Sequence, residues 1–144
     1  MATEADIQRD LNAAMKARDM TRVYVLRGLL AAIKNVKVDK QVSEVPGSEI
    51  ASLVRKEINK RIEAAEFASK GGRAELVESN RMEQGILEAY LPAQLDAARL
   101  DAVIRELAQE LGSPAIGPIM AKLKERYPGQ YDGKLASELA RKLA

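Results

Sequence analysis

The chain of 144 residues contains no cysteine, no histidine and no tryptophan, and only one phenylalanine and four tyrosines. Without cysteine it can form no disulfide and can offer no thiolate to a substrate or a metal. Without histidine it lacks the commonest general base and the commonest metal ligand. These absences argue against an enzyme that acts as an isolated chain. We therefore predict no catalytic residue, no metal site and no cofactor.

The sequence also lacks a strong excess of one charge and a long apolar run. Its 23 Lys and Arg residues nearly balance its 21 Asp and Glu residues, for a net charge of +2. This balance does not by itself indicate nucleic-acid binding. No apolar run approaches a membrane span, and the N-terminus has no basic and apolar leader. We expect a cytoplasmic monomer that has no membrane segment.

Helical periodicity runs through the whole chain, and no stretch alternates with a period of two, so we predict an all-α fold. The N-terminal part is expected to form a bundle of about four helices. Residues 39–48 are expected to form a loop, with Ser48 capping the third helix. Gly71 and Gly72 should end that helix and join it to a fourth, over residues 73–91, as an antiparallel hairpin.

Pro92 marks the expected boundary between two parts of the chain. Proline has no backbone N–H and disfavours helical geometry in the residue before it, so the fourth helix should end near Leu91. Asp96 can cap the next helix, and Asp132 can cap the last one. Pro118 is expected at the first position of the helix between them. We predict an N-terminal helical domain over residues 1–91 and a three-helix domain over residues 92–144.

One group of candidate binding residues lies near the C-terminus and is mostly basic. It consists of Lys122, Lys124, Arg126, Gly133, Lys134, Arg141 and Lys142. Lys134 falls in the first turn of its helix, where exposed N–H groups and the helix dipole could hold a phosphate. The alternative is that these are solubilising side chains, because Glu125 and Glu138 interrupt the basic face.

A secondary basic face is predicted on the second helix. It consists of Arg22, Arg27, Lys34 and Lys37, and no acidic residue lies between Arg22 and Val38. The alternative is an ordinary charged flank of a buried helix. Because aromatic residues that could stack on bases are scarce, contact with a nucleic-acid backbone is more plausible than reading of single-stranded bases.

Several segments together resemble the GatB/YqeY family, and within it the YqeY-like proteins. The segments are Val25–Asn35, Lys56–Arg61, Gly72-Arg73 with Leu76, Tyr90–Leu95 and Asp132–Leu135. They occur in the family's order and span nearly the whole chain. The resemblance implies an N-terminal helical bundle and a C-terminal part similar to the tail domain of the GatB subunit of tRNA-dependent amidotransferase.

In that enzyme, which amidates Glu-tRNA or Asp-tRNA with glutamine as nitrogen donor, the tail contacts the tRNA body and holds no active site. The resemblance thus implies a non-catalytic, tRNA-associated module, with tRNA and a translation-related enzyme as candidate partners. The family-level activity would be that of a carbon–nitrogen ligase with glutamine as amido donor. The alternative is an adaptor that binds another protein, through the fourth helix or the Gly71-Gly72 hairpin, and no RNA.

Overall fold

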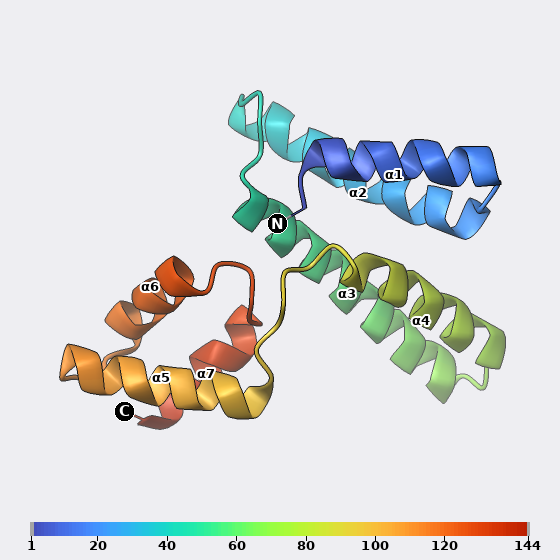
Figure 1. The fold of residues 1–144 in the computed structure, drawn as a ribbon. Coiled ribbons are helices and arrows are strands. Elements are labelled where there is room, and N and C mark those ends of the chain that lie inside the picture. The colour runs from blue at the N-terminus through green and yellow to red at the C-terminus, as the bar shows by residue number, and fades with distance from the viewer. Residues whose placement is uncertain (1, 144) are drawn as a thin grey trace. The chain divides into compact units, whose positions relative to one another are not determined.

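The computed structural model describes residues 2–143, which form seven α-helices and no β-strand (Figure 1). The helices are α1 (Glu4–Ala17), α2 (Met20–Lys40), α3 (Gly47–Lys70), α4 (Ala74–Glu88), α5 (Ala97–Leu111), α6 (Ile116–Arg126) and α7 (Gly133–Leu143). The all-α prediction is therefore confirmed. None of the helices in the described residues is long and apolar enough to cross a membrane. The chain divides into two compact units, Met1–Leu91 (unit 1) and Pro92–Ala144 (unit 2).

In unit 1, α1 and α2 lie side by side as an antiparallel hairpin (Figure 1). A capping box starts α1: the Thr3 hydroxyl accepts from the Asp6 N–H at 3.2 Å, and the Asp6 carboxylate accepts from the Thr3 N–H at 3.0 Å. The hydrogen bond from the Thr3 backbone is the main reason that the pKa of Asp6 is lowered. Arg18, in the left-handed conformation, ends α1 and lets the chain reverse at once.

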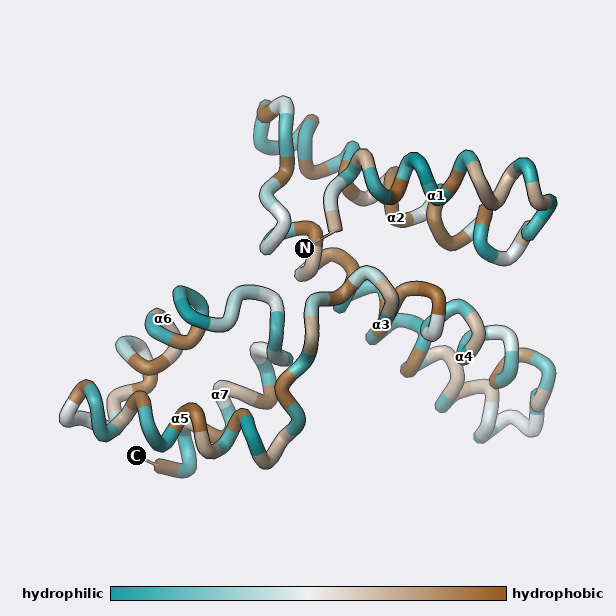
Figure 2. Tube along the Cα trace, viewed as in Figure 1, coloured by the Kyte–Doolittle hydropathy of each residue, from teal (hydrophilic) through white to brown (hydrophobic). Residues whose placement is uncertain are grey.

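A second hairpin, α3 with α4, completes unit 1. Its turn needs Gly72, whose φ of +69° lies in the left-handed region, and the Arg73 N–H donates to the Ala68 carbonyl at 2.8 Å. The two hairpins meet in one core. Its buried members are Ile7, Leu11, Ala14, Val23, Val25, Leu26, Leu29, Ile33, Ile50, Val54, Ile58, Leu87 and Tyr90. Figure 2 shows apolar positions recurring along these helices at the spacing that such a core requires.

Tyr90 ties the end of the second hairpin to the first helix. Its side chain is buried, and its hydroxyl donates to the Asp10 carboxylate at 2.7 Å. Burial and this neighbouring carboxylate raise the pKa of Tyr90, because both disfavour the phenolate. The α1–α2 and α3–α4 hairpins are therefore joined by a polar contact as well as by apolar packing.

Unit 2 contains α5, α6 and α7, each of which packs against the other two. Its buried core comprises Leu100, Ile104, Leu107, Ile119, Leu123, Ala136 and Ala140. Asp96 caps α5 by accepting from the Arg99 N–H at 2.8 Å, as the sequence predicts. The Leu95 N–H donates to the Gln130 carbonyl at 2.8 Å, so the segment before α5 is held by the loop before α7.

The fourth helix ends earlier than its predicted range of 73–91. It stops at Glu88, and α5 begins only at Ala97, so no helix runs through Pro92. The chain leaves the helix through a tight turn in which the Tyr90 N–H donates to the Leu87 carbonyl at 3.0 Å. This turn carries the Tyr90 side chain into the core of unit 1. Tertiary packing therefore shortens the helix before proline alone would end it.

Two predicted helix starts are wrong by two residues each. Helix α3 begins at Gly47 with Pro46 as its cap, so Ser48 lies inside the helix and does not cap it. Helix α6 begins at Ile116, so Pro118 is its third residue and not its first. The first N–H groups of a helix have no partner within it, and a proline anywhere in that turn therefore costs no hydrogen bond.

Candidate functional site

The predicted basic residues of unit 2 lie on α6 and α7, on the more basic part of that unit. Residues 113–144 contain six Lys or Arg against three Asp or Glu, whereas residues 92–112 contain two against four. The charge of unit 2 is thus segregated between α5 and the other two helices. Four of these cations, Lys124, Lys134, Arg141 and Lys142, are exposed and have no acidic partner within residues 2–143.

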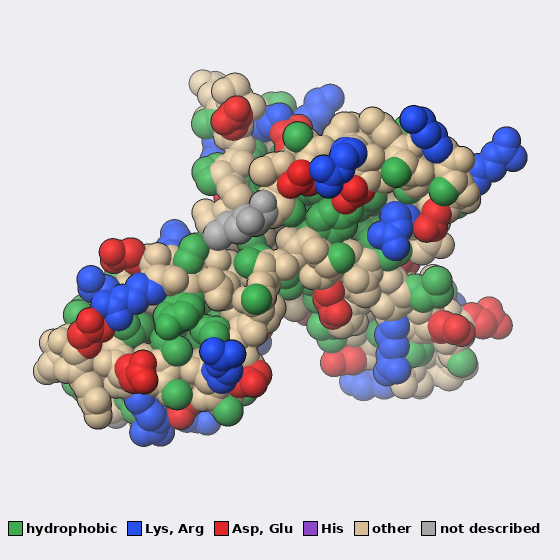
Figure 3. Space-filling model, in the orientation of Figure 1, with side chains coloured by type: hydrophobic (Ala, Val, Ile, Leu, Met, Phe, Trp, Pro, Cys, Tyr) green, Lys and Arg blue, Asp and Glu red, His purple; other side chains and the backbone are tan. Residues whose placement is uncertain are grey.

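Arg126, by contrast, is held by a carboxylate from α5. Its two terminal nitrogens Nη1 and Nη2 each donate to Glu110, at 2.7 Å. These hydrogen bonds lower the pKa of Glu110 and raise that of Arg126. Lys122 lies 3.8 Å from Glu125. Two of the predicted binding residues are therefore partly neutralised, and Figure 3 shows Lys and Arg interspersed with Asp and Glu on the face that it presents.

The start of α7 differs from the phosphate cradle that its sequence suggests. Asp132 accepts from the Lys134 N–H at 3.0 Å, which confirms the predicted cap. Its carboxylate occupies the donor that a phosphate would need, and its charge opposes an anion there. Gly133 leaves open space, since a Cβ at this position would meet nothing within 4 Å. The side chain of Lys134, and not the N-terminus of α7, therefore remains available to bind a phosphate.

The structure separates the four cations of the secondary basic face on α2 into two pairs. Arg22 lies 3.4 Å from its capping residue Asp19, and Lys37 is paired with Glu4 of α1. Arg27 and Lys34 are exposed and have no carboxylate partner among the described residues. Arg27 has one described contact, with the sulfur of Met15 at 3.5 Å. The face that the sequence predicts as one basic surface is therefore reduced to two unneutralised cations.

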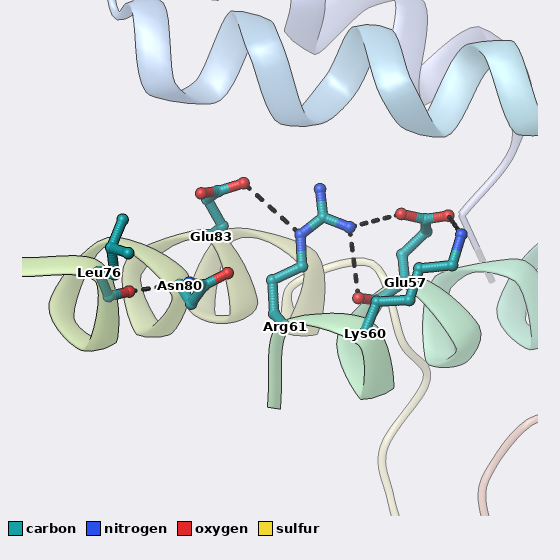
Figure 4. A network of polar contacts seen from close by, with 6 residues as sticks. All are labelled: Glu57, Lys60, Arg61, Leu76, Asn80 and Glu83. Atoms are coloured by element: carbon teal, nitrogen blue, oxygen red, sulfur yellow. Dashed lines mark hydrogen bonds and ion pairs between the residues drawn. The ribbon is translucent and has the colours of Figure 1, made fainter. Parts of the chain in front are cut away.

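A network of charged side chains links α3 to α4 in unit 1 (Figure 4). Arg61 donates to Glu57 on its own helix and lies 3.5 Å from Glu83 on the neighbouring one. Lys60 donates to Glu57 at 3.2 Å. Burial opposes ionisation of Glu57, but the hydrogen bonds from Arg61 and Lys60 outweigh it and lower its pKa. The remaining Arg61 nitrogen points toward the α2 ribbon.

This network forms one wall of a groove of about 650 Å³ in unit 1, with α2 as the other wall. The residues that line it are Tyr24, Arg27, Gly28, Glu57, Lys60, Arg61, Ala64, Asn80 and Glu83. We call it the α2 groove. The contact of Arg61 with Glu83 was not among the sequence-based predictions. A signal was available, since Arg61 and Glu83 lie at equal distances in sequence from Gly72 and so face each other across an antiparallel hairpin.

Curated proteins similar to this chain are named "Altered inheritance of mitochondria protein 41, mitochondrial". The protein of Eremothecium gossypii is 30% identical over 125 residues, which cover 83% of this chain and 68% of the relative. That of Lachancea thermotolerans is 36% identical over 110 residues, covering 74% of this chain and 58% of the relative. That of Kluyveromyces lactis is 34% identical over 110 residues, covering 74% of this chain and 59% of the relative. The chain thus spans about two thirds or less of these relatives.

These names correct the cytoplasmic expectation, which is wrong by this comparison. Every matched relative described above, and that of Vanderwaltozyma polyspora, is named as a mitochondrial protein. The expectation rested on the absence of an apolar leader and of a membrane span. Those features report on export and membrane insertion, and they do not distinguish the cytosol from the interior of an organelle.

The family profile described as "Yqey-like protein" matches residues 4–143. The match begins with α1 and ends with the last residue of α7, so it includes both units and all seven helices. The resemblance seen in the sequence motifs is confirmed at the level of the YqeY-like family. Both candidate surfaces, the cations of α6 and α7 and the α2 groove, lie inside the matched range. The chain belongs to the YqeY-like protein family.

Proposed function

We propose that this protein is a non-catalytic helical module that associates with tRNA through the cations of α6 and α7. The observation that carries the proposal is the charge segregation in unit 2, where the cations outnumber the acids two to one over residues 113–144. Segregation of this kind gives a chain of small net charge a local surface that attracts phosphates. Lys124, Lys134, Arg141 and Lys142 supply that attraction, because no described carboxylate neutralises them.

The resemblance of unit 2 to the GatB tail supports the same proposal. In the amidotransferase the tail contacts the body of the tRNA, and the chemistry takes place elsewhere in the complex. By analogy, this protein would hold tRNA alone or beside a translation-related enzyme. Any ligase activity with glutamine as nitrogen donor would belong to that enzyme. The paucity of aromatic side chains favours contact with the phosphate backbone over stacking on bases.

A salt titration with tRNA tests the proposal directly. Binding of fluorescently labelled tRNA to the full chain should weaken steeply as salt rises, because each phosphate contact releases counterions. Lys124→Ala and Lys134→Ala should each reduce the slope of log K against log salt by roughly one unit. Arg105→Ala is the matched control, since Arg105 lies on α5 in the same unit and is already paired with Asp101 at 2.9 Å.

The outcome also separates this proposal from its alternative. If the protein is instead an adaptor that binds another protein and no RNA, we expect no tRNA binding even at low salt. Binding whose salt slope is the same for Lys124→Ala, Lys134→Ala and Arg105→Ala would place the RNA contact away from α6 and α7, and the proposal would then be abandoned.

A further inference from the structure

Helix α2 exposes a second apolar stripe opposite to the one that it buries. Met20, Tyr24 and Val38 are 64%, 69% and 67% exposed. Gly28 and Ala31 lie between them on the same face and are also exposed. A helix that carries apolar residues on two opposite sides is normally covered on both. In unit 1, α2 is covered on one side only, so its outer stripe lacks a partner.

The spacing along this stripe is that of a helix–helix seam. Tyr24, Ala31 and Val38 are seven residues apart, and Gly28 and Asn35 alternate with them at steps of four and three. This is the pattern by which one helix inserts its side chains between those of another. Arg27 and Lys34, also seven residues apart, flank the seam on one side. In such seams the flanking charges determine which partner is accepted.

The α2 groove borders the N-terminal part of this seam, where Tyr24 and Gly28 line it. Gly28 lies in its wall, and a Cβ at that position would meet nothing within 4 Å. The facing wall comes from α3 and α4 and includes Lys60, Ala64 and Asn80. The Asn80 amide nitrogen donates to the Leu76 carbonyl at 2.8 Å, which leaves its oxygen able to accept a hydrogen bond. An incoming helix would therefore have α2 on one side and the hairpin on the other.

The charges beside the outer stripe of α2 indicate which kind of partner can bind there. No acidic residue occurs in α2 from Met20 to Val38, and neither Arg27 nor Lys34 has a carboxylate partner in the described chain. The α2 of a second copy would bring the same cations and would be repelled. A nucleic acid fits poorly, because the groove offers one aromatic side chain and places Glu57 and Glu83 opposite to α2. A helix can limit its carboxylates to positions that face the two cations.

We propose that the outer stripe of α2, which borders the α2 groove at Tyr24 and Gly28, seats an amphipathic helix of another protein that carries carboxylates seven residues apart beside its apolar stripe. The partner's apolar stripe covers Tyr24, Ala31 and Val38, and its carboxylates pair with Arg27 and Lys34. This is the helix-in-groove mode of recognition. This site lies in unit 1 and uses none of the cations of α6 and α7. The proposal can therefore be tested independently of the tRNA proposal.

Two synthetic peptides test the proposal against the full chain. The first is a labelled helix of about 21 residues, three heptads, with leucine and alanine along one stripe and glutamate at every seventh flanking position. The second has lysine in place of those glutamates. Fluorescence anisotropy should show binding of the first peptide, and roughly tenfold weaker binding of the second, since each exposed charge pair contributes little by itself. Arg27→Glu/Lys34→Glu should reverse this preference.

Gly28→Leu provides a second variant that does not depend on charge. The larger side chain fills open space on the surface of α2 and raises helix propensity, so the protein should fold and circular dichroism should be unchanged. Binding of the first peptide should be lost. Lys70→Glu/Arg81→Glu is the matched control, because it changes the net charge equally while both residues line a different groove on the hairpin. This variant should bind the first peptide as the wild type does.

Each other outcome overturns the proposal. Equal binding of both peptides, or of neither, would show that Arg27 and Lys34 select no acidic helix. Unchanged binding by Gly28→Leu would place the peptide elsewhere. A labelled oligouridine added in parallel tests the nucleic-acid reading, and its tighter binding, with sensitivity to Gly28→Leu, would assign the groove to RNA.

Discussion

Unit 2 completes its core with three short helices, each of which has one apolar stripe and turns it inward. Unit 1 is larger but less complete, because its two hairpins share one core and leave other apolar side chains uncovered. Phe67 of α3 is 78% exposed, and Tyr24 of α2 is 69% exposed. The contrast extends to the polar contacts: unit 1 contains the Arg61 network and the Tyr90–Asp10 hydrogen bond, whereas the ion pairs of unit 2 lie at its surface.

The difference indicates where each unit can meet a partner. A helix with a single apolar stripe is satisfied once that stripe is buried, and what it presents to the outside is charge. Unit 2 can therefore offer mainly its cations. Helix α2 has apolar residues on two sides, so one side remains after folding. Unit 1 can offer the exposed apolar stripe of α2, and the two units are suited to different kinds of partner.

The largest expected effect comes from opening the core of unit 2. Ile104 is fully buried, and Ile104→Ala should cost about 3 kcal/mol of the free energy of unfolding. A domain of this size buries little apolar surface and has little stability to lose. We therefore expect unit 2 to unfold while unit 1 stays folded, because the two cores share no residue. Hydrogen exchange followed by mass spectrometry would locate the loss of protection.

Leu26→Ala is the matched change in unit 1, where Leu26 is also fully buried. Leu26→Ala should lower the free energy of unfolding by about as much as Ile104→Ala does. Unit 1 is larger, so it should remain folded and show only a lower urea midpoint. Loss of protection in both units from Ile104→Ala would break the comparison, since it would show that the units do not unfold separately.

The next effect is expected from Tyr90→Phe, which removes the hydrogen bond to Asp10. It should cost about 1–2 kcal/mol in urea unfolding at neutral pH. The raised pKa of Tyr90 makes the free energy of unfolding depend on pH. The stabilisation that Tyr90 contributes is present below its unfolded pKa of about 10, and it is lost as pH rises through the folded value. The variant should therefore lose less stability than the wild type between pH 9 and pH 11.

Tyr131 in unit 2 serves as the internal control for that pH series. Burial raises its pKa as well, so unit 2 should still lose stability above pH 10 in both proteins. An alkaline loss in unit 1 that Tyr90→Phe leaves unchanged would mean that another group causes it.

A smaller effect should follow from removing a helix cap. Asp96→Ala leaves the Arg99 N–H without its acceptor and should cost about 1 kcal/mol in unit 2. Asp96→Asn keeps an acceptor oxygen in place and should recover most of that loss. Urea unfolding followed by circular dichroism measures both. An equal loss in the two variants would show that the charge of Asp96, and not its cap, stabilises α5.

The smallest expected effect is that of Glu110→Gln, which releases Arg126. Because Arg126 lowers the pKa of Glu110, the pair stabilises unit 2 above the unfolded pKa of Glu110 and stops doing so as pH falls through its folded value. As pH falls from 5 to 3, the free energy of unfolding of the variant should decrease less than that of the wild type. It should also bind tRNA more tightly at low salt, with a salt slope steeper by about one unit. A salt slope that stays the same would exclude Arg126 from the RNA contact.

Some features set by local chemistry could be predicted from the sequence, although the starts of α3 and α6 were not. The turn at Gly71 and Gly72, and the caps at Asp96 and Asp132, depend on residues within a few positions of one another. Features set by distant contacts could not. The early end of α4 depends on where Tyr90 packs, and the division of the α2 cations depends on Glu4, which a second helix places beside Lys37. Charge pairing between helices therefore limited the prediction of the candidate sites.

The position of Arg61 and Glu83 at equal distances from Gly72 limits how the length of the hairpin can change. Deleting one residue at the turn would rotate one arm by about 100° and move Glu83 away from Arg61. An insertion in one arm would leave the half-buried Arg61 with one carboxylate in place of two. Only changes that add equal lengths to both arms, in whole turns, preserve the pair. The Arg61–Glu83 ion pair is therefore kept only when both helices of the hairpin change in length by the same number of turns.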